Sequence, residues 1–162
     1  MLHHVSVGVS DFARAARFYD AVLATLGFQR VADYSPHAIG YGEDHPEFWI
    51  GAPHNGGPMS IGNGVHMGFS ARSKAQVAKF HEVALAMGAS NNGEPGPRPD
   101  YGPDYYGAFV FDLDGNKIEA TLHPRPAMPA KAAARKPALK AAKKKVAKKA
   151  VKKKAKRKAR RR

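Results

Sequence analysis

The chain has 162 residues, contains no cysteine and carries a formal net charge of +14 at pH 7. The lack of cysteine excludes a disulfide framework, a thiolate metal site and a cysteine nucleophile. Residues 1–124 hold eight lysines or arginines and thirteen acidic residues, whereas residues 125–162 hold nineteen basic residues and no acidic one. We therefore expect one domain of ordinary size over residues 1–124, with charge −5, and a separate segment of charge +19 over residues 125–162.

The N-terminal sequence MLHHVSVGVSDFARAARFYD has no basic region followed by an unbroken apolar stretch. A secretory signal peptide or a membrane-spanning helix needs such a stretch. The default expectation is therefore a cytoplasmic protein.

An internal repeat with an offset of 62 residues runs through the first 124 residues. At this offset residues 4–8 (HVSVG) lie over residues 66–70 (HMGFS), and residues 17–20 (RFYD) lie over residues 79–82 (KFHE). Self-similarity at a fixed offset indicates a duplicated structural unit.

Each copy begins with alternating apolar and polar residues, which predicts a half-buried strand, and continues into a helix. The first helix is expected to begin after Asp11 as N-cap and to stop at Gly27. The second is expected to begin after Ser73, with Gln76 placed for a capping box, and to stop at Gly88. The apolar stripe of each helix is expected to cover the apolar faces of the strands.

Short strands are predicted after each helix, at residues 28–32, 38–41 and 47–51 in the first copy and at residues 105–112 and 117–123 in the second. An Asp114-Gly115 pair between the last two strands indicates a tight hairpin. The preceding segment, NNGEPGPRPDYGPDY, is rich in glycine and proline, which predicts a mobile loop without a long regular element.

These elements predict an α+β fold made of two paired βαβββ modules, at about residues 1–57 and 62–124. The second module is expected to have a weak or short second strand. We expect the modules to form one cup-shaped mixed sheet, followed by the basic segment as a disordered tail.

Three polar residues are candidates for a metal site in this cup. Glu119 alternates with Ile118 and Ala120 and so lies on the polar face of the last strand, and His4 and His66 lie on polar faces at repeat-equivalent positions. If a pseudo-twofold axis relates the repeats, the two imidazoles and the carboxylate can meet near it. Such a set suits Fe(II), Mn(II), Ni(II) or Zn(II) with positions open for substrate. Alternatively, each histidine is an incidental polar residue on a solvated sheet face.

Three segments together resemble the vicinal oxygen chelate superfamily, which includes glyoxalase I, extradiol dioxygenases, fosfomycin-resistance enzymes and bleomycin resistance proteins. They are residues 3–28 (HHVSVGVSDFARAARFYDAVLATLGF), 65–69 (VHMGF) and 112–120 (DLDGNKIEA). The resemblance implies paired βαβββ modules around a divalent metal, with His4, His66 and Glu119 as its ligands. It further implies a lyase, isomerase or dioxygenase acting on a small molecule with vicinal oxygens.

One position departs from the glyoxalase I pattern, which has a fourth ligand on the last strand of the first module. Trp49 stands where a second glutamate would be needed, and Glu47 is one strand step away on the same face. The departure favours a three-ligand site, although Glu47 could substitute.

Other residues are candidates for substrate contacts and proton transfer. Trp49 and Tyr106 are expected to line the cup, and Arg98, in the predicted loop, to donate hydrogen bonds to a substrate carboxylate or phosphate. A solvated loop arginine is the alternative. Glu119 and His123, which share a strand face, are the candidate acid–base groups. Tyr105 faces the other side of its strand from Tyr106 and is expected to be a packing residue.

The segment 125–162 resembles, in composition only, the Lys/Ala/Pro-rich tails of linker histones and bacterial histone-like proteins. It contains no aromatic residue to stack on bases, so we expect non-specific binding to nucleic acid. A solubilising tail without a partner, or binding to ribosomes, polyphosphate or an anionic membrane, are the alternatives.

Three functions are compatible with these patterns. The first is a metal-dependent enzyme, localised on nucleic acid by its tail. The second is a metal-free protein that binds a drug or metabolite through aromatic residues of the cup. The third is a nucleoid-associated DNA-binding protein that uses the domain as a dimeric or sensory head. The family resemblance implies that a homodimer is possible.

Overall fold

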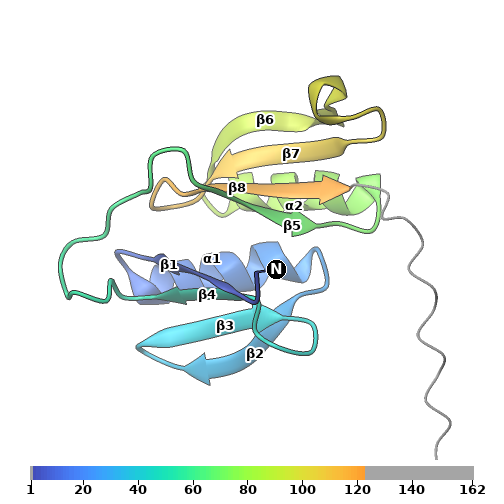
Figure 1. Cartoon of the computed structure of the whole chain (residues 1–162). Helices are drawn as coiled ribbons and strands as arrows, with labels where there is room; N and C mark the ends of the chain where they lie inside the picture. The colour runs from blue at the N-terminus through green and yellow to red at the C-terminus, as the bar shows by residue number, and fades with distance from the viewer. Residues whose placement is uncertain (1, 123–162) are drawn as a thin grey trace, which may run out of the picture. The chain divides into compact units, whose positions relative to one another are not determined.

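The computed structural model describes residues 2–122, which form eight strands, two α-helices and one short 3₁₀-helix (Figure 1). The first module contains β1 (Val5–Gly8), α1 (Phe12–Ala24), β2 (Gln29–Tyr34), β3 (Ala38–Gly42) and β4 (Phe48–Gly51). The second contains β5 (His66–Ser70), α2 (Lys74–Ala86), β6 (Ser90–Pro97), η1 (Pro99–Tyr101), β7 (Tyr106–Phe111) and β8 (Lys117–Leu122). The predicted α+β class and the two βαβββ modules are confirmed.

The two modules have the same topology. Their strand orders are β1-β4-β3-β2 and β5-β8-β7-β6; β1 pairs with β4, and β5 with β8, in parallel, and the other pairs are antiparallel. The expected cup-shaped mixed sheet consists, in the described strands, of two separate four-stranded mixed sheets, one in each module. The edge strands β1 and β5 do not pair with one another, and both line a hollow together with residues 60–65, which connect the modules.

Local sequence sets the helix boundaries, as predicted. The Asp11 carboxylate accepts a hydrogen bond from the Arg14 N–H (2.9 Å) at the start of α1. The Ser73 hydroxyl accepts one from the Gln76 N–H (3.2 Å) at the start of α2. These bonds satisfy amide groups that have no partner within the helix. A glycine in the left-handed region of φ follows each helix: Gly27 (φ 89°) and Gly88 (φ 99°).

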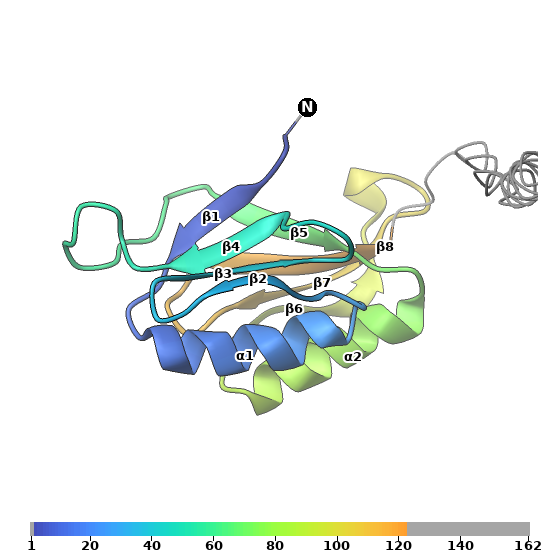
Figure 2. The same cartoon turned by 90° about the horizontal axis from the view of Figure 1, so that it is seen from below.

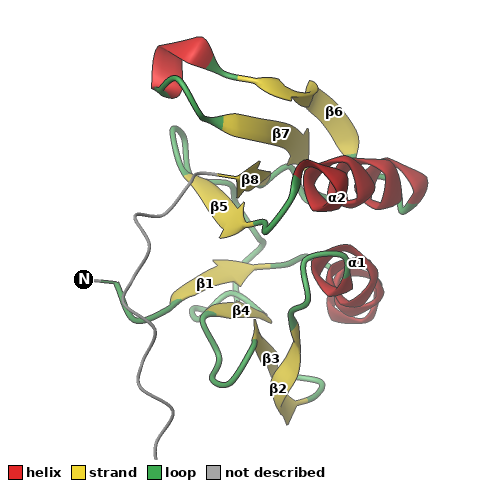
Figure 3. Ribbon diagram, turned by 90° about the vertical axis from the view of Figure 1, so that its right-hand side faces the viewer, coloured by secondary structure: helices red, strands yellow, loops and turns green. Residues whose placement is uncertain are grey.

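Both helices lie on the same side of the strands, α1 over the first sheet and α2 over the second (Figures 2 and 3). The apolar stripes of the helices and the apolar strand faces form one buried core. Side chains on the opposite faces of the two sheets are therefore free to form a site. The largest fully buried apolar side chains are Tyr19, Tyr41, Phe18, Phe80, Leu23 and Leu26.

The segment before β7 differs from its prediction as a mobile loop. It contains β6, an eight-residue strand that pairs with β7 and carries two register irregularities, one on either side of Gly93. β6 is the edge of its sheet, where a proline costs no ladder hydrogen bond on the free side. Gly93 has a φ of 151° and so allows a bulge. An edge position and bulges therefore reconcile this glycine- and proline-rich sequence with a strand.

A buried hydrogen bond joins the two modules. The Tyr19 hydroxyl on α1 donates to Asp112 Oδ2 (2.6 Å) in the turn between β7 and β8. Asp112 Oδ1 also accepts from the N–H groups of Asp114 (2.9 Å) and Asn116 (2.7 Å), and Gly115 adopts a φ of 89°. Ser10, just before α1, contacts the Asp114 carboxylate. The predicted Asp-Gly hairpin is confirmed, and it also fixes the second module to the first.

The chain ends bear on two further predictions. His123 and the basic segment 125–162 lie outside the described residues, so the structure does not address them. Within residues 2–122, neither helix is long and apolar enough to cross a membrane.

Candidate functional site

Glu119 is a buried carboxylate on the sheet face that the helices do not cover. It lies in the middle of β8, with only 1% of its surface exposed. Its Oε1 accepts a hydrogen bond from the Tyr105 hydroxyl (2.5 Å), and its Oε2 lies 3.4 Å from Nε2 of His66 on β5. The His66 side chain is 48% exposed. A buried carboxylate is costly unless its oxygens are paired, and here each oxygen has one neighbour in the described residues.

Two glycines leave room for this carboxylate. A Cβ atom at Gly107 of β7 would lie 2.9 Å from Glu119 Oε1, which is too close for an unstrained contact. A Cβ atom at Gly68 of β5 would lie 3.5 Å from Oε2, which is an ordinary contact. Gly107 is therefore required by the position of the Glu119 side chain, whereas Gly68 is only compatible with it.

Tyr105 and Tyr106 lie on opposite faces of their strand, as the alternation requires, but Tyr105 is the one that reaches the site. Burial raises the pKa of the Tyr105 hydroxyl, and the hydrogen bond to Glu119 raises it further. Tyr106, expected to line the cup, packs against the core and lies under the Lys74 ammonium of α2, 5.1 Å from the ring centre. Tyr105 therefore takes the place that sequence reasoning gave to Tyr106.

The pairing register of the β7–β8 hairpin indicates which face of the sheet each of the two tyrosines occupies. The Asp-Gly turn pairs Tyr106 with Leu122 and Gly107 with Thr121. Leu122 belongs to the apolar series of β8, so Tyr106 must share the core face, and Tyr105 the face of Glu119.

His4 contacts His3, and it lines a different hollow from His66. Its ring is exposed, and its Nδ1 is 2.9 Å from Nδ1 of His3. Within the described part of the chain no three His, Asp or Glu side chains are grouped closely enough to hold a metal ion. In Figure 1, β1 and β5 run in opposite directions at the neighbouring edges of the two sheets.

Trp49 occupies the position in the first module that Glu119 occupies in the second. It pairs with Ser6 of β1, just as Glu119 pairs with Gly68 of β5. Its indole stacks on the Tyr34 ring, with centroids 6.1 Å apart and planes 13° apart. Glu47, the possible substitute ligand, has a 55% exposed side chain 3.7 Å from His45 Nε2.

A hollow of about 630 Å³ opens on the free face of the first sheet. Its lining combines imidazoles with apolar side chains from β1, β4 and the neighbouring loops. The ring side chains among them are His3, His4, His37, Trp49 and His54. His4 and Trp49 thus belong to the same hollow, and Glu119 does not.

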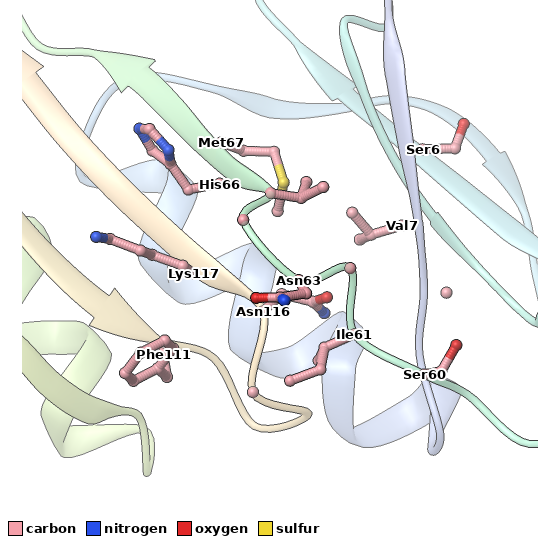
Figure 4. Close-up of a pocket in the computed structure, with 15 residues that line it drawn as sticks. Ser6, Val7, Ser60, Ile61, Asn63, His66, Met67, Phe111, Asn116 and Lys117 are labelled. Carbon is pink, nitrogen blue, oxygen red and sulfur yellow. The ribbon is translucent and has the colours of Figure 1, made fainter.

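A second hollow, of about 420 Å³, lies between the modules (Figure 4). Ser6 and Val7 of β1 line one side, residues 60–65 cross it, and His66 and Lys117 line the other side. Figure 4 shows the His66 and Lys117 side chains extending in the same direction from adjacent strands. No acidic residue lines this hollow in the described part of the chain.

Arg98 follows β6 directly and is held by its own backbone surroundings. Its guanidinium donates hydrogen bonds to the carbonyl oxygens of Glu94 (2.6 Å) and Pro97 (3.2 Å). Its Cζ lies 5.3 Å from the centre of the Phe109 ring. The side chain is therefore positioned over the free face of the second sheet.

The donor chemistry of His66 and Glu119 fits part of a divalent metal site. Two ligand atoms at about 2.1 Å from one tetrahedral ion are roughly 3.4 Å apart, the separation of His66 Nε2 and Glu119 Oε2. The imidazole nitrogen and the carboxylate oxygen suit Fe(II), Mn(II), Ni(II) or Zn(II). The same two groups, together with Tyr105, can also hold and transfer protons near a bound small molecule.

Comparison with protein-family models matches residues 1–120 to the Glyoxalase/Bleomycin resistance protein/Dioxygenase superfamily. No curated protein is a significant match. Among solved structures, a glyoxalase/bleomycin resistance protein from Albidiferax ferrireducens T118 is 40% identical, with a TM-score of 0.65, over 75% of this chain and 98% of that one. A lactoylglutathione lyase from Agrobacterium tumefaciens is 19% identical, with a TM-score of 0.54, over 75% and 92% of the two chains; this match shows the fold alone.

Proposed function

Because this chain belongs to the glyoxalase/bleomycin resistance protein/dioxygenase superfamily, we propose that it is an enzyme acting on a small molecule with two neighbouring oxygens. The reaction class is a lyase, isomerase or dioxygenase reaction, and the proposed reacting site lies on β5 and β8 of the second module. The observation that carries the proposal is the buried Glu119 carboxylate, with one oxygen held by Tyr105 and the other facing His66 at 3.4 Å.

In this proposal His66 Nε2 and Glu119 Oε2 hold a divalent metal ion. The ion, when bound, supplies a Lewis acid for neighbouring substrate oxygens. Tyr105 fixes the rotamer of Glu119 through Oε1, so that Oε2 stays directed at His66. His4 is the proposed third donor, although in the structure its ring contacts His3 rather than Glu119.

Metal titration of the full chain by calorimetry, with Zn(II), Mn(II) and Ni(II), tests this proposal. We expect His66→Ala and Glu119→Gln each to abolish the binding seen in the wild type, and His45→Ala, an exposed histidine outside the site, to leave it unchanged. A His4→Ala variant decides the third donor: weakened binding supports His4, and unchanged binding limits the protein donors to two. If the wild type binds none of these ions, or if all variants bind equally, the metal site is refuted.

The first module favours a second candidate function, metal-free binding of a drug or metabolite. The hollow of about 630 Å³ contains Trp49, the only tryptophan of the chain. Binding of a flat ligand there should therefore change the intrinsic tryptophan fluorescence. A fluorescence change that survives dialysis against chelator and is lost in Trp49→Ala would support this function. A change that requires added metal would instead support the first proposal.

The +19 charge of residues 125–162 favours an additional role in non-specific nucleic-acid binding, which is compatible with either function. Each phosphate neutralised should add about 0.9 to the slope of log affinity against log salt for duplex DNA. We expect a chain ending at His123 to lose DNA binding at 150 mM salt, whereas the full chain binds all sequences similarly. Equal DNA affinity of the two chains would exclude the basic segment as the binding element.

A further inference from the structure

Two cations lie at the same aromatic ring on the free face of the second sheet. Lys117 Nζ is 4.9 Å from the centre of the Phe109 ring, and Arg98 Cζ is 5.3 Å from it. Phe109 is itself only 6% exposed, so its ring forms a floor under the two side chains. A ring quadrupole attracts a cation without neutralising its charge, which leaves both charges available to a ligand.

Neither cation has an acidic partner in the described part of the chain. Within residues 2–122, no carboxylate oxygen lies within 4.0 Å of Lys117 or Arg98. The carboxylate of Glu94, whose backbone carbonyl accepts from Arg98, accepts a hydrogen bond from Asn91 (2.7 Å) and faces His81 (3.7 Å). The Glu119 carboxylate is held by Tyr105 and His66. The two positive charges are therefore uncompensated by ion pairs.

Their position places these charges beside the proposed reacting site. Lys117 is the register partner of His66 across β5 and β8, and it lies two residues before Glu119 on the same face. Positions two apart on one strand are about 7 Å apart, which is the reach of a small substrate. The His66 and Lys117 side chains extend toward the same side of their strands (Figure 4).

An exposed aromatic side chain borders the same region. Tyr101 of η1 is 60% exposed, and its ring lies 5.3 Å from the Tyr105 ring and 6.4 Å from the Phe109 ring, edge to face. It offers an apolar surface next to the two cations.

We propose that Lys117 and Arg98, above Phe109, form a subsite for an oxyanionic group of the substrate, and that Tyr101 contacts the adjoining apolar part. This inference rests on the proposed function for the identity of the site, and it adds the substrate class. The substrate is a small organic anion whose carboxylate or phosphate group lies about 7 Å from its reacting oxygens, which is the spacing of Lys117 and Glu119 along β8. Lys117 is the specificity-determining residue, because its ammonium group makes no ion pair with a carboxylate of residues 2–122, whereas Arg98 uses two of its donors on backbone carbonyls.

The test is a titration of the metal-free full chain with inorganic phosphate and, separately, with acetate, followed by NMR through the amide signals of β5, β7 and β8. Site-specific signals are needed because the basic segment also attracts anions. We expect saturable shifts at His66, Lys117 and Glu119. Lys117→Met should weaken this binding on the order of tenfold, since it removes a charged hydrogen bond and keeps an apolar stem over Phe109. A response to phosphate alone, or to acetate alone, identifies which oxyanion the subsite takes.

Lys74→Met is the matched control. Lys74 also lies over an aromatic ring of β7, that of Tyr106, but on the side of the sheet that faces α2. The two substitutions change the net charge equally, so equal weakening by both would show a general charge effect and overturn the subsite. Wild-type signals on β8 that respond to neither anion would also overturn it. Because the protein is free of metal in this experiment, a failure of the metal site leaves the result valid.

Discussion

The two modules share one framework but present different chemistry on their free faces. Trp49 and Glu119 occupy the same register position, one paired with Ser6 and the other with Gly68. The first face has an aromatic stack and exposed imidazoles, whereas the second has a buried carboxylate, a tyrosine, a histidine and two cations. The duplicated modules are therefore two similar scaffolds with different side chains at equivalent positions, and this difference is why the proposed reacting site lies on the second module.

The two modules must be held together for this difference between their faces to matter. Asp112→Ala is expected to reduce the free energy of unfolding more than any other substitution considered. It leaves the buried Tyr19 hydroxyl without its acceptor and removes the acceptor of two N–H groups in the β7–β8 turn. We expect the free energy of unfolding, from urea titration, to fall by about 3 kcal/mol.

Asp44→Ala, which removes an exposed carboxylate, is the control for the loss of one negative charge. Asp112→Asn keeps one oxygen acceptor and should destabilise the protein less than Asp112→Ala. If Asp112→Ala lowers the free energy of unfolding no more than Asp44→Ala does, the hydrogen bond between Tyr19 and Asp112 does not stabilise the contact between the modules.

The next largest loss of unfolding free energy is expected from a substitution that fills the space beside the Glu119 carboxylate. Gly107→Ala places a methyl group 2.9 Å from Glu119 Oε1 and 3.3 Å from the Ala120 carbonyl oxygen, so the carboxylate must move. We expect a loss of about 2 kcal/mol in unfolding free energy, together with weaker metal binding. Gly68→Ala, with its nearest atom at 3.5 Å, is the matched variant and should change both quantities little. Equal effects of the two substitutions would mean that the Glu119 carboxylate is not confined by Gly107.

Local sequence was sufficient for most of the fold. The N-caps Asp11 and Ser73 and the Asp-Gly turn satisfy backbone groups within a few residues, so their sequence patterns determine local structure directly. β6 was missed because glycine and proline were interpreted as ending a strand. Their cost depends on whether the strand is an edge and carries bulges, which is decided by tertiary pairing.

The site was less accessible from sequence, because it depends on how the strands lie relative to one another. Periodicity gives the face of each residue but not how β1 and β5 lie relative to one another, and among the described residues His4, His66 and Glu119 are not grouped closely enough to hold a metal ion. Periodicity also placed Tyr105 and Tyr106 on opposite faces without indicating which face is the core. The uncharged partner Leu122 on β8 carries that information, through the register of the hairpin.

The loss of stability at alkaline pH allows the tyrosine hydroxyl groups of the two modules to be compared. Burial is the main cause of the raised pKa of Tyr19 and Tyr41 in the first module and of Tyr105 in the second, with Asp112, Asp20 and Glu119 respectively adding to it. A raised pKa in the folded state means that the unfolded chain loses its protons first. Stability is therefore retained below the unfolded pKa of about 10 and decreases as the pH rises above it.

Unfolding free energies measured from pH 8 to pH 11 should decrease with pH less steeply in Tyr19→Phe than in the wild type, and Tyr105→Phe should show a smaller change of slope. Lysines titrate in the same range but are identical in all three proteins. The same slope in every variant would mean that the hydroxyl groups of the tyrosines do not contribute to the alkaline loss.

The smallest effect on the unfolding free energy is expected at Asp33, on the surface of the first module, which lines neither hollow. Hydrogen bonds from the Ser35 hydroxyl and N–H, followed by Arg30, lower the pKa of Asp33 to about 2. A lowered pKa stabilises the folded state above the unfolded value of about 3.9, and this contribution is lost as the pH falls toward 2. Because Asp33 is exposed, Ser35→Ala should raise its pKa, seen by NMR of the carboxyl carbon, while the unfolding free energy at pH 7 changes less than in any variant above. If the pKa of Asp33 stays near 2 in Ser35→Ala, then the backbone N–H of residue 35 and Arg30, rather than the Ser35 hydroxyl, are the main causes of its acidity.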